Sequence, residues 1–412
     1  MPRFEGRLSA LRHPGYLRYW LGSFASVGAT QLQIMGQGWL VYELTGSALM
    51  LGYLGAAASI PAIVMTLFGG ALADRLNKQH VLMTTSLVVA VLILGLAGLD
   101  ATEQVTAWHV ILIAGVVSFT SGFDWPTRQS IFPTLIERDD MMSAVALNSI
   151  IWQSSRMIMP ALGGLLIAVT DTWVVFVLCA AGFLTMFFVV AGLKLDLPKP
   201  VITASTLQQI GEGLGYIFHN RLFLVLISMS YASMFFANTH MQLMPAFSGL
   251  LGAGETGYGY LISATGVGSV VGTVLVGSFQ SSRQLGNIIF ASAALAGVCI
   301  YGFCLATHLA ATLPLAYALA MTSVFAAAVF SSVFMICSMT ALQLQVPDEL
   351  RGRVMGFHGI TYSLMPLGGL AAGALATLMS APMAVAIGIS VYLLILGLLV
   401  VTQHQVRQLS GN

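Results

Sequence analysis

The run WVVFVLCAAGFLTMFFVVAGL, residues 173–193, decides the class of fold, because it contains no charged residue and only one hydroxyl side chain. About 20 apolar residues in a helix span the roughly 30 Å hydrocarbon core of a bilayer. Similar runs recur along the whole chain of 412 residues, which is 57% hydrophobic and only 8% charged. Soluble domains carry roughly 25% charged residues. The composition therefore predicts a membrane protein.

Twelve such runs are predicted to form transmembrane helices. Their approximate bounds are 19–42, 49–73, 81–99, 108–123, 144–169, 173–193, 222–247, 258–279, 286–306, 313–338, 356–379 and 382–402. Helices are favoured over a β-barrel because the runs are long and continuously apolar rather than alternating. The predicted fold is an all-α membrane protein with twelve transmembrane helices.

The basic residues predict the orientation of these helices. Every Lys and Arg outside the runs falls in a terminus or a loop on the same side, and only Arg156 lies within a run. The loops on the other side carry acids such as Glu43 and Asp100, but no Lys or Arg. The positive-inside rule then places both termini in the cytoplasm. We expect a multi-pass protein of the cytoplasmic (inner) membrane.

An internal repeat divides the chain into two halves. The sequence MPALGGL at 159–165 returns as MPLGGL at 365–370, so the two Met-Pro pairs lie 206 positions apart, half the chain length. The fifth run therefore corresponds to the eleventh, and six runs make one unit. We predict two pseudo-symmetric six-helix halves, 1–193 and 222–412, joined by a cytoplasmic linker at 194–221. This architecture is typical of secondary transporters.

Three motifs resemble the major facilitator superfamily, and the resemblance covers the whole chain. They are GGALADRLNK at 69–78, FDWPTRQ at 123–129 and PALGG at 160–164. Within the superfamily, the chain is similar to the branch of enterobactin exporters and macrolide-efflux proteins. The resemblance implies export of a drug-like compound or siderophore by proton antiport with alternating access, with the proton gradient in place of any cofactor. Alternatives are a lipid or lysophospholipid transporter of the same fold, a proton symporter, and a membrane sensor without transport activity.

Five charged residues are candidates for gating or proton coupling. The resemblance implies that Asp74 and Arg75 form a cytoplasmic latch, although a short charged loop also serves topology alone. Asp124 and Arg128 follow the fourth run, at its cytoplasmic end. Arg156 is a functional candidate because an unpaired charge inside a membrane is costly. It could bind an anionic substrate group, pair with Asp124 as a gate, or form a static ion pair.

Polar side chains recur at helical spacing on several runs and are predicted to line a central cavity. Residues three or four positions apart share one face of a helix. The predicted lining is Gln33, Gln37, Asn148, Trp152, Tyr231, Asn238 and Gln242. The alternative is that these side chains hold neighbouring helices together. A lining of uncharged polar and aromatic groups suits amphipathic or moderately apolar small molecules.

Six residues are predicted structural hinges because proline bends a helix and paired glycines permit close packing. They are Pro160, Gly163 and Gly164 in the fifth run, and Pro366, Gly368 and Gly369 in the eleventh. The resemblance implies that the first set corresponds to the antiporter motif of the superfamily.

Proton carriage has no obvious residue, since none of the fifteen acids falls in the middle of a run. His240 is expected to be a packing histidine, and His358 is expected to lie at the membrane interface. No Walker loop or catalytic motif occurs, so the chain is not expected to be an enzyme. We expect no metal site and, at a net charge of +1, no nucleic-acid partner. The expected partners are a small-molecule substrate and the lipid bilayer, with the protein a monomer.

Overall fold

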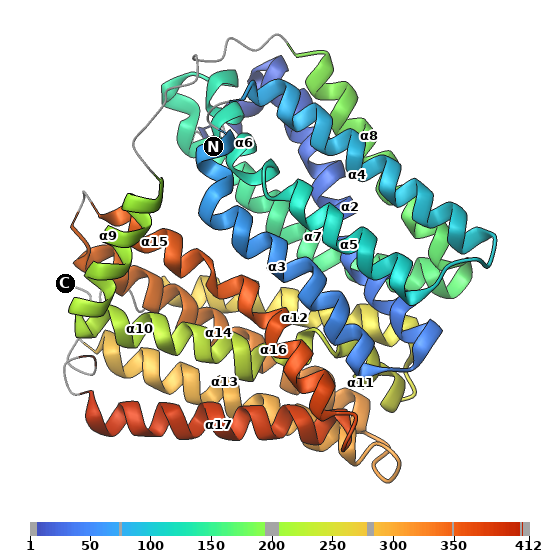
Figure 1. Ribbon diagram of the computed structural model, residues 1–412, viewed down its shortest axis with the longest axis vertical. Helices are drawn as coiled ribbons and strands as arrows, with labels where there is room; N and C mark the ends of the chain where they lie inside the picture. The colour runs from blue at the N-terminus through green and yellow to red at the C-terminus, as the bar shows by residue number, and fades with distance from the viewer. Residues whose placement is uncertain are drawn as a thin grey trace. The chain divides into compact units, whose positions relative to one another are not determined.

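The computed structural model describes residues 6–73, 76–193, 206–277, 284–347, 350–403 and 406, and every regular element in these residues is helical (Figure 1). Ten helices in this part of the chain are long and apolar enough to cross a membrane. They are 48–66, 78–101, 107–135, 138–169, 172–191, 221–241, 254–276, 285–308, 316–345 and 381–402. The chain is therefore a multi-pass, all-α membrane protein.

These ten helices correspond to predicted runs two to ten and run twelve. The first predicted run lies in one continuous helix, α2 (Pro14–Thr45), which carries many polar side chains along its length. The eleventh is divided at Ile360 into two shorter helices, α15 (Arg351–Gly359) and α16 (Thr361–Leu375).

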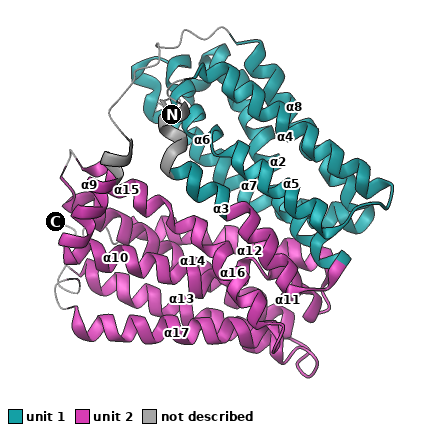
Figure 2. Ribbon diagram, viewed as in Figure 1, with its two compact units in different colours: residues 1–44, 60–204 teal, residues 45–59, 205–412 magenta. Residues whose placement is uncertain are grey.

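The chain forms two compact units, residues 1–44 with 60–204, and residues 45–59 with 205–412 (Figure 2). Helix α3 (Ala48–Ala73) contributes to both, and the change from one unit to the other falls beside Pro61 within the helix. The other elements of the first unit are η1 (Gly6–Arg12), α2, α4 (Lys78–Ala101), α5 (Ala107–Ser121), α6 (Asp124–Ile131), η2 (Phe132–Leu135), η3 (Arg138–Asp140), α7 (Met141–Val169) and α8 (Thr172–Ala191).

Side-chain caps fix where several of these helices begin. The Oδ1 atom of Asn77 accepts hydrogen bonds from the backbone N–H groups of Gln79 and His80, at 3.0 and 3.2 Å, and α4 starts there. Thr106 and His109 form a reciprocal capping box at the start of α5. Such caps satisfy N–H groups that have no partner within the helix.

Helix α2 packs closely on α8 and is tied to α7 in the first unit. A Cβ atom at Gly182 would lie 2.7 Å from the carbonyl oxygen of Ala25, so only glycine permits this approach of α8 to α2. At the beginning of α2, the Tyr16 hydroxyl donates to the carbonyl of Ala144 at 3.1 Å. His13 pairs with Asp140 at 2.7 Å, which joins the same segment to η3.

The second unit contains the first part of α3 and the remaining helices. They are α9 (Thr206–His219), α10 (Arg221–Ala232), η4 (Ser233–Ala237), η5 (Asn238–Met241), α11 (Met244–Leu250), α12 (Gly254–Val276), α13 (Leu285–His308), α14 (Ala316–Gln345), α15, α16 and α17 (Ala381–Thr402). Helices α12, α13, α14 and α17 pack against one another in the order α12, α14, α13, α17.

The predicted seventh run is not one regular helix. After α10, residues 233–237 form a π-helical turn and residues 238–241 a 3-10 turn. The side-chain Nδ2 atom of Asn238 donates to the carbonyl of Ser233 at 3.2 Å and lies 3.4 Å from the Ser233 hydroxyl. A π-turn adds a residue to the helical turn, so side chains after it point in different directions from those of an uninterrupted α-helix.

The predicted hinge of the eleventh run lies where α16 crosses this irregular segment. A Cβ atom at Gly368 would overlap the carbonyl oxygen of Phe235, so backbone approaches backbone there. Gly369 lies against the side chain of Gln242, and Pro366 lies against Gly55 of α3. In the first unit, Pro160, Gly163 and Gly164 are all buried within α7, and Gly163 packs on Leu32 and Met35 of α2.

Candidate functional site

An ion pair at the start of α6 is the centre of the candidate site. Asp124 begins this helix, and Arg128 lies one turn later, so that the Nε atom of Arg128 donates to the Oδ2 atom of Asp124 at 2.5 Å. The Arg128 side chain is 10% exposed and that of Asp124 is 26% exposed. A buried guanidinium requires a paired carboxylate because an uncompensated buried charge is strongly destabilising.

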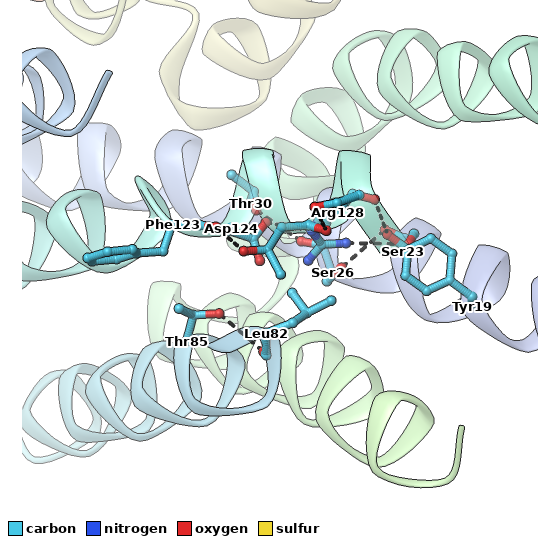
Figure 3. A network of polar contacts seen from close by, with 11 residues as sticks. Tyr19, Ser23, Ser26, Thr30, Leu82, Thr85, Phe123, Asp124 and Arg128 are labelled. Carbon is cyan, nitrogen blue, oxygen red and sulfur yellow. Dashed lines mark hydrogen bonds and ion pairs between the residues drawn. The ribbon is translucent and has the colours of Figure 1, made fainter. Parts of the chain in front are cut away.

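Helix α2 supplies the other contacts of this pair (Figure 3). The Nη1 atom of Arg128 lies 3.4 Å from the Ser23 hydroxyl, and the Tyr19 hydroxyl lies 3.4 Å from the Arg128 carbonyl oxygen. Ser23 and Tyr19 are both buried, one turn apart on α2. The two long contacts place α6 against one face of α2.

That face continues as a polar stripe along α2. Its members recur at spacings of four and three, which is one side of an α-helix, and they are Tyr19, Ser23, Ser26, Thr30, Gln33 and Gln37. The hydroxyls of Ser26 and Thr30 donate to the carbonyls of Ser23 and Ser26, at 3.2 and 3.0 Å. Of these members the sequence predicted only Gln33 and Gln37, and the structure places them on the same face of α2 as Ser23, which contacts the ion pair.

Gln33 and Gln37 form the other end of the stripe. Each is 4% exposed, and the Nε2 atom of Gln33 donates to the Oε1 atom of Gln37 at 3.4 Å. The remaining amide atoms, Gln33 Oε1 and Gln37 Nε2, are buried without a hydrogen-bond partner in the described part of the chain. One free acceptor and one free donor therefore stand one helical turn apart. Such buried groups cost free energy unless a partner satisfies them.

A cavity of about 450 Å³ lies within the first unit and reaches Phe123, the neighbour of Asp124 in the chain. Its walls come from the first turns of α4, from the two residues before that helix, and from Phe123. The lining is Leu76, Asn77, His80, Val81, Thr84, Thr85 and Phe123. A volume of this size lies within the range of small-molecule sites.

The structure does not join Arg156 to Asp124. Arg156 is exposed, and no carboxylate among the described residues forms an ion pair with it; Asp124 pairs with Arg128 instead. The predicted Arg156–Asp124 pair is thus not formed in this structure, where Asp124 pairs with Arg128 one turn later on α6. Of the other predicted members on α7, Asn148 is half-buried, and Trp152 packs edge-on against Trp125 with ring centroids 5.3 Å apart.

The predicted members in the second unit bond to backbone groups. The Tyr231 hydroxyl donates to the carbonyl of Phe357 at 2.7 Å, and Gln242 Nε2 donates to the carbonyl of Leu51 at 2.7 Å. Asn238 closes the π-turn as described above. These bonds hold α10, α15, α3 and the irregular segment together, which is the packing role that the sequence left open.

Asp74 and Arg75 lie outside the described residues. Sequence reasoning did not find Tyr19, Ser23 or Ser26, although their spacing with Thr30 was a usable signal. In the described residues, no group of three or more His, Cys, Asp or Glu side chains is placed to hold a metal.

A profile of the family described as transmembrane secretion effector matches residues 5–412. The chain belongs to this family of major facilitator superfamily transporters. It is 25% identical to the multidrug efflux pump Tap of Mycolicibacterium fortuitum, over 90% of this chain and 91% of that protein. It is 23% identical to the enterobactin exporter EntS of Shigella boydii, over 97% and 95% of the two chains. The staphyloferrin A transporter of Staphylococcus aureus is 22% identical, over 82% and 83%.

Solved transporter structures share the fold of this family member. The nucleoside transporter NupG superposes with a TM-score of 0.73 and 15% identity, covering 94% of this chain and 98% of that one. A bacterial homologue of the iron transporter ferroportin gives a TM-score of 0.71 at 14% identity, covering 92% and 98%. At these identities the likeness establishes the fold alone. The family and its relatives are transporters, not enzymes.

Proposed function

We propose that the protein exports a small molecule, a drug-like compound or a siderophore, across the cytoplasmic membrane by proton antiport with alternating access. The carrying observation is the polar stripe of α2, which runs from the Asp124–Arg128 pair to the free amide groups of Gln33 and Gln37. Three relatives matched over more than four fifths of the chain transport drugs or siderophores by their names.

In this proposal, α2 and the split segment α15–α16 also cross the membrane, which makes twelve spans in two six-helix halves with both termini in the cytoplasm. The one-sided distribution of Lys and Arg supports this orientation. The Gln33 and Gln37 amides would bind an uncharged polar group of the substrate. The ion pair would lie at the cytoplasmic end of the same stripe and respond to protonation of Asp124.

The test uses purified protein in liposomes with an imposed pH gradient and three probes: enterobactin, staphyloferrin A and ethidium. Proton antiport predicts movement of at least one probe against its own gradient, lost when the pH gradient is collapsed. Asp124→Asn is expected to reduce this movement at least tenfold. Asp100→Asn is the matched control, because Asp100 is a half-buried carboxylate of the same unit that hydrogen-bonds to Thr172 instead of to an arginine.

Transport that ignores the pH gradient would refute antiport and leave facilitated movement. Movement of a fluorescent lysophospholipid, with none of the three probes moved, would replace the exporter by a lipid transporter. Accumulation of a probe together with protons would indicate a symporter.

A further inference from the structure

His358 and Thr361 are two buried polar side chains, three positions apart, without hydrogen-bond partners in the described residues. His358 is 3% exposed and Thr361 is fully buried, and neither the Nε2 atom of His358 nor the Thr361 hydroxyl has a partner in the described residues. That His358 lies at the membrane interface stays a prediction, and the structure adds that its side chain is buried within the second unit. Buried polar atoms of this kind are few in folded proteins, and each calls for an explanation.

The two side chains share one face of the helix. Ile360, which joins α15 to α16, has helical dihedral angles (φ −62°, ψ −22°), and its N–H donates to the Phe357 carbonyl three residues earlier at 3.1 Å. In such a tightened turn, side chains three positions apart are aligned. Val354, one turn before His358, is fully buried as well, so this face belongs to the interior of the second unit.

Tyr231 explains why the Thr361 hydroxyl is free. A threonine within a helix commonly donates to the carbonyl four residues earlier, as Thr30 and Thr120 do here. For Thr361 that carbonyl belongs to Phe357, which already accepts the Tyr231 hydroxyl at 2.7 Å and the Ile360 N–H. Tyr231 thereby leaves the Thr361 hydroxyl free to accept a hydrogen bond from another group.

Among the described residues, the elements packed against His358 offer it no unpaired carboxylate. Helix α15 packs against α9, α14 and α16, and against α10 through Tyr231. The ionisable side chains on these elements are Glu212, Tyr216, His219, Arg221, Tyr231, Tyr317, Cys337, Arg351, Arg353 and Tyr362. Glu212 is the one carboxylate among them in the described residues, and it pairs with Arg353. Asp348 and Glu349 lie outside the described residues.

His240 provides a comparison within the same unit. It is also 3% exposed, but its Nδ1 atom bonds to the Ala237 carbonyl at 3.1 Å, and its ring packs on Phe303 with centroids 5.8 Å apart. His240 is a packing histidine, as the sequence indicated, whereas His358 has an unused ring nitrogen.

The internal repeat points to the same pair. With a spacing of 206 positions, Thr361 corresponds to Ser155 and His358 to Trp152. Ser155 is fully buried, and its hydroxyl likewise has no partner in the described residues. Both halves therefore keep a buried free hydroxyl at this position, and only the second half has an ionisable ring three positions before it.

We propose that His358 carries a coupling proton of the exporter in the second unit, in addition to the protonation of Asp124 in the first, and that the protonated ring turns to donate a hydrogen bond to the Thr361 hydroxyl. This inference rests on the proposed function. Neutral imidazole with its proton on Nδ1 has a lone pair on Nε2. This nitrogen takes up a proton, and the new N–H group donates a hydrogen bond to the Thr361 hydroxyl. When the ring is deprotonated, the proton leaves to water and the hydroxyl can donate back to Nε2. Imidazole is the side chain whose ordinary charge change falls between pH 5 and 8.

The first test measures protonation without transport. The protein is labelled with [13C]histidine at the ring Cε1 atom, purified in detergent and titrated by NMR from pH 5 to 9. The signal missing in His358→Gln is expected to titrate within this range. Thr361→Val should lower the titration midpoint of the His358 signal by about half a pH unit or more, because the protonated ring loses the hydroxyl that accepts its hydrogen bond. His219→Gln, at an exposed histidine, should leave the His358 signal unchanged.

The second test separates coupling from substrate movement in liposomes. His358→Gln should reduce gradient-driven movement of ethidium at least tenfold, while ethidium exchange at equal pH on both sides stays within about twofold of the unmodified protein. A His358 signal that does not titrate, or gradient-driven movement unchanged in His358→Gln, overturns the proposal. If the unmodified protein moves no probe, the proposed function fails, and the NMR titration still decides whether His358 binds a proton.

Discussion

Arg128 and Asp124 are joined at 2.5 Å across one turn of α6, and the arginine is the more deeply buried of the two. This difference in burial makes the two charges unequal in what their removal costs in stability. The carboxylate can be hydrated when the pair opens, whereas the guanidinium has Ser23 as its other polar contact in the described residues. Removing the carboxylate alone should therefore lower the free energy of unfolding more than removing both charges.

We expect Asp124→Asn to destabilise the purified protein by about 1–3 kcal/mol, less than for a fully buried pair because Asp124 is partly exposed. Arg128→Gln together with Asp124→Asn should recover part of this loss. Thermal unfolding in detergent measures both variants and the Arg128→Gln single variant. Strictly additive effects in this cycle would show that the two side chains do not interact.

Replacing the buried amides of α2 should separate stability from transport. Gln33→Met and Gln37→Met remove amide atoms that have no partner, so the melting temperature should stay the same or rise. Movement of substrates in liposomes should fall several-fold, because the polar contacts for the substrate are lost. Ser86→Ala is the control, since it removes a buried unpaired hydroxyl on α4, away from the stripe. Equal losses of transport in all three variants would count against a binding role for the glutamines.

Arg156 should matter for transport more than for stability. It is exposed and makes no ion pair with a described carboxylate, so Arg156→Gln should shift the melting temperature by no more than about 1 °C. If the side chain binds an anionic substrate group, the variant should move the anionic dye calcein several-fold more slowly and ethidium at an unchanged rate. Arg156→Lys keeps the charge and should retain part of the calcein movement. Unchanged calcein movement in Arg156→Gln would exclude this role.

Gly368 should tolerate no side chain. A methyl group there would overlap the Phe235 carbonyl, and backbone cannot move aside as a flexible side chain can, so Gly368→Ala should cost about 3 kcal/mol or more. Gly356→Ala is the matched control, because its new methyl group would meet no atom within 4 Å. This control should be neutral or stabilise α15 by about 0.5–1 kcal/mol. The two variants are compared by their yield of monodisperse protein and by their melting temperature. Similar values for Gly368→Ala and Gly356→Ala would show that α16 has room to shift.

The exposed pair between Glu212 and Arg353 should contribute little. Both side chains are about a third or more exposed, so Glu212→Gln should change the free energy of unfolding by less than about 1 kcal/mol. Urea unfolding followed by tryptophan fluorescence can measure this difference. A larger loss would indicate that the pair holds α9 on α15 more firmly than its exposure implies.

The site was only partly predictable from sequence. Asp124 and Arg128 could be selected because charges are scarce in this chain, but their pairing depends on α6 beginning at Asp124 and placing Arg128 one turn later, against Ser23. The interruption of the seventh run at 233–241 was not visible, because hydropathy measures the apolar character of a segment and not its hydrogen-bond register. The stripe predicted across it was therefore only approximate.

The sequence by itself determined that this is a helical membrane protein of the major facilitator superfamily. Lipid permits few architectures and requires long apolar runs, and the motifs of the superfamily are visible in the sequence. Tertiary structure alone decided which polar groups have partners. The hydroxyl of Thr361 is unsatisfied because Tyr231, 130 residues earlier, occupies the carbonyl that Thr361 would otherwise use. Hydrogen-bond satisfaction depends on atoms brought together by packing, and no spacing along the chain records it.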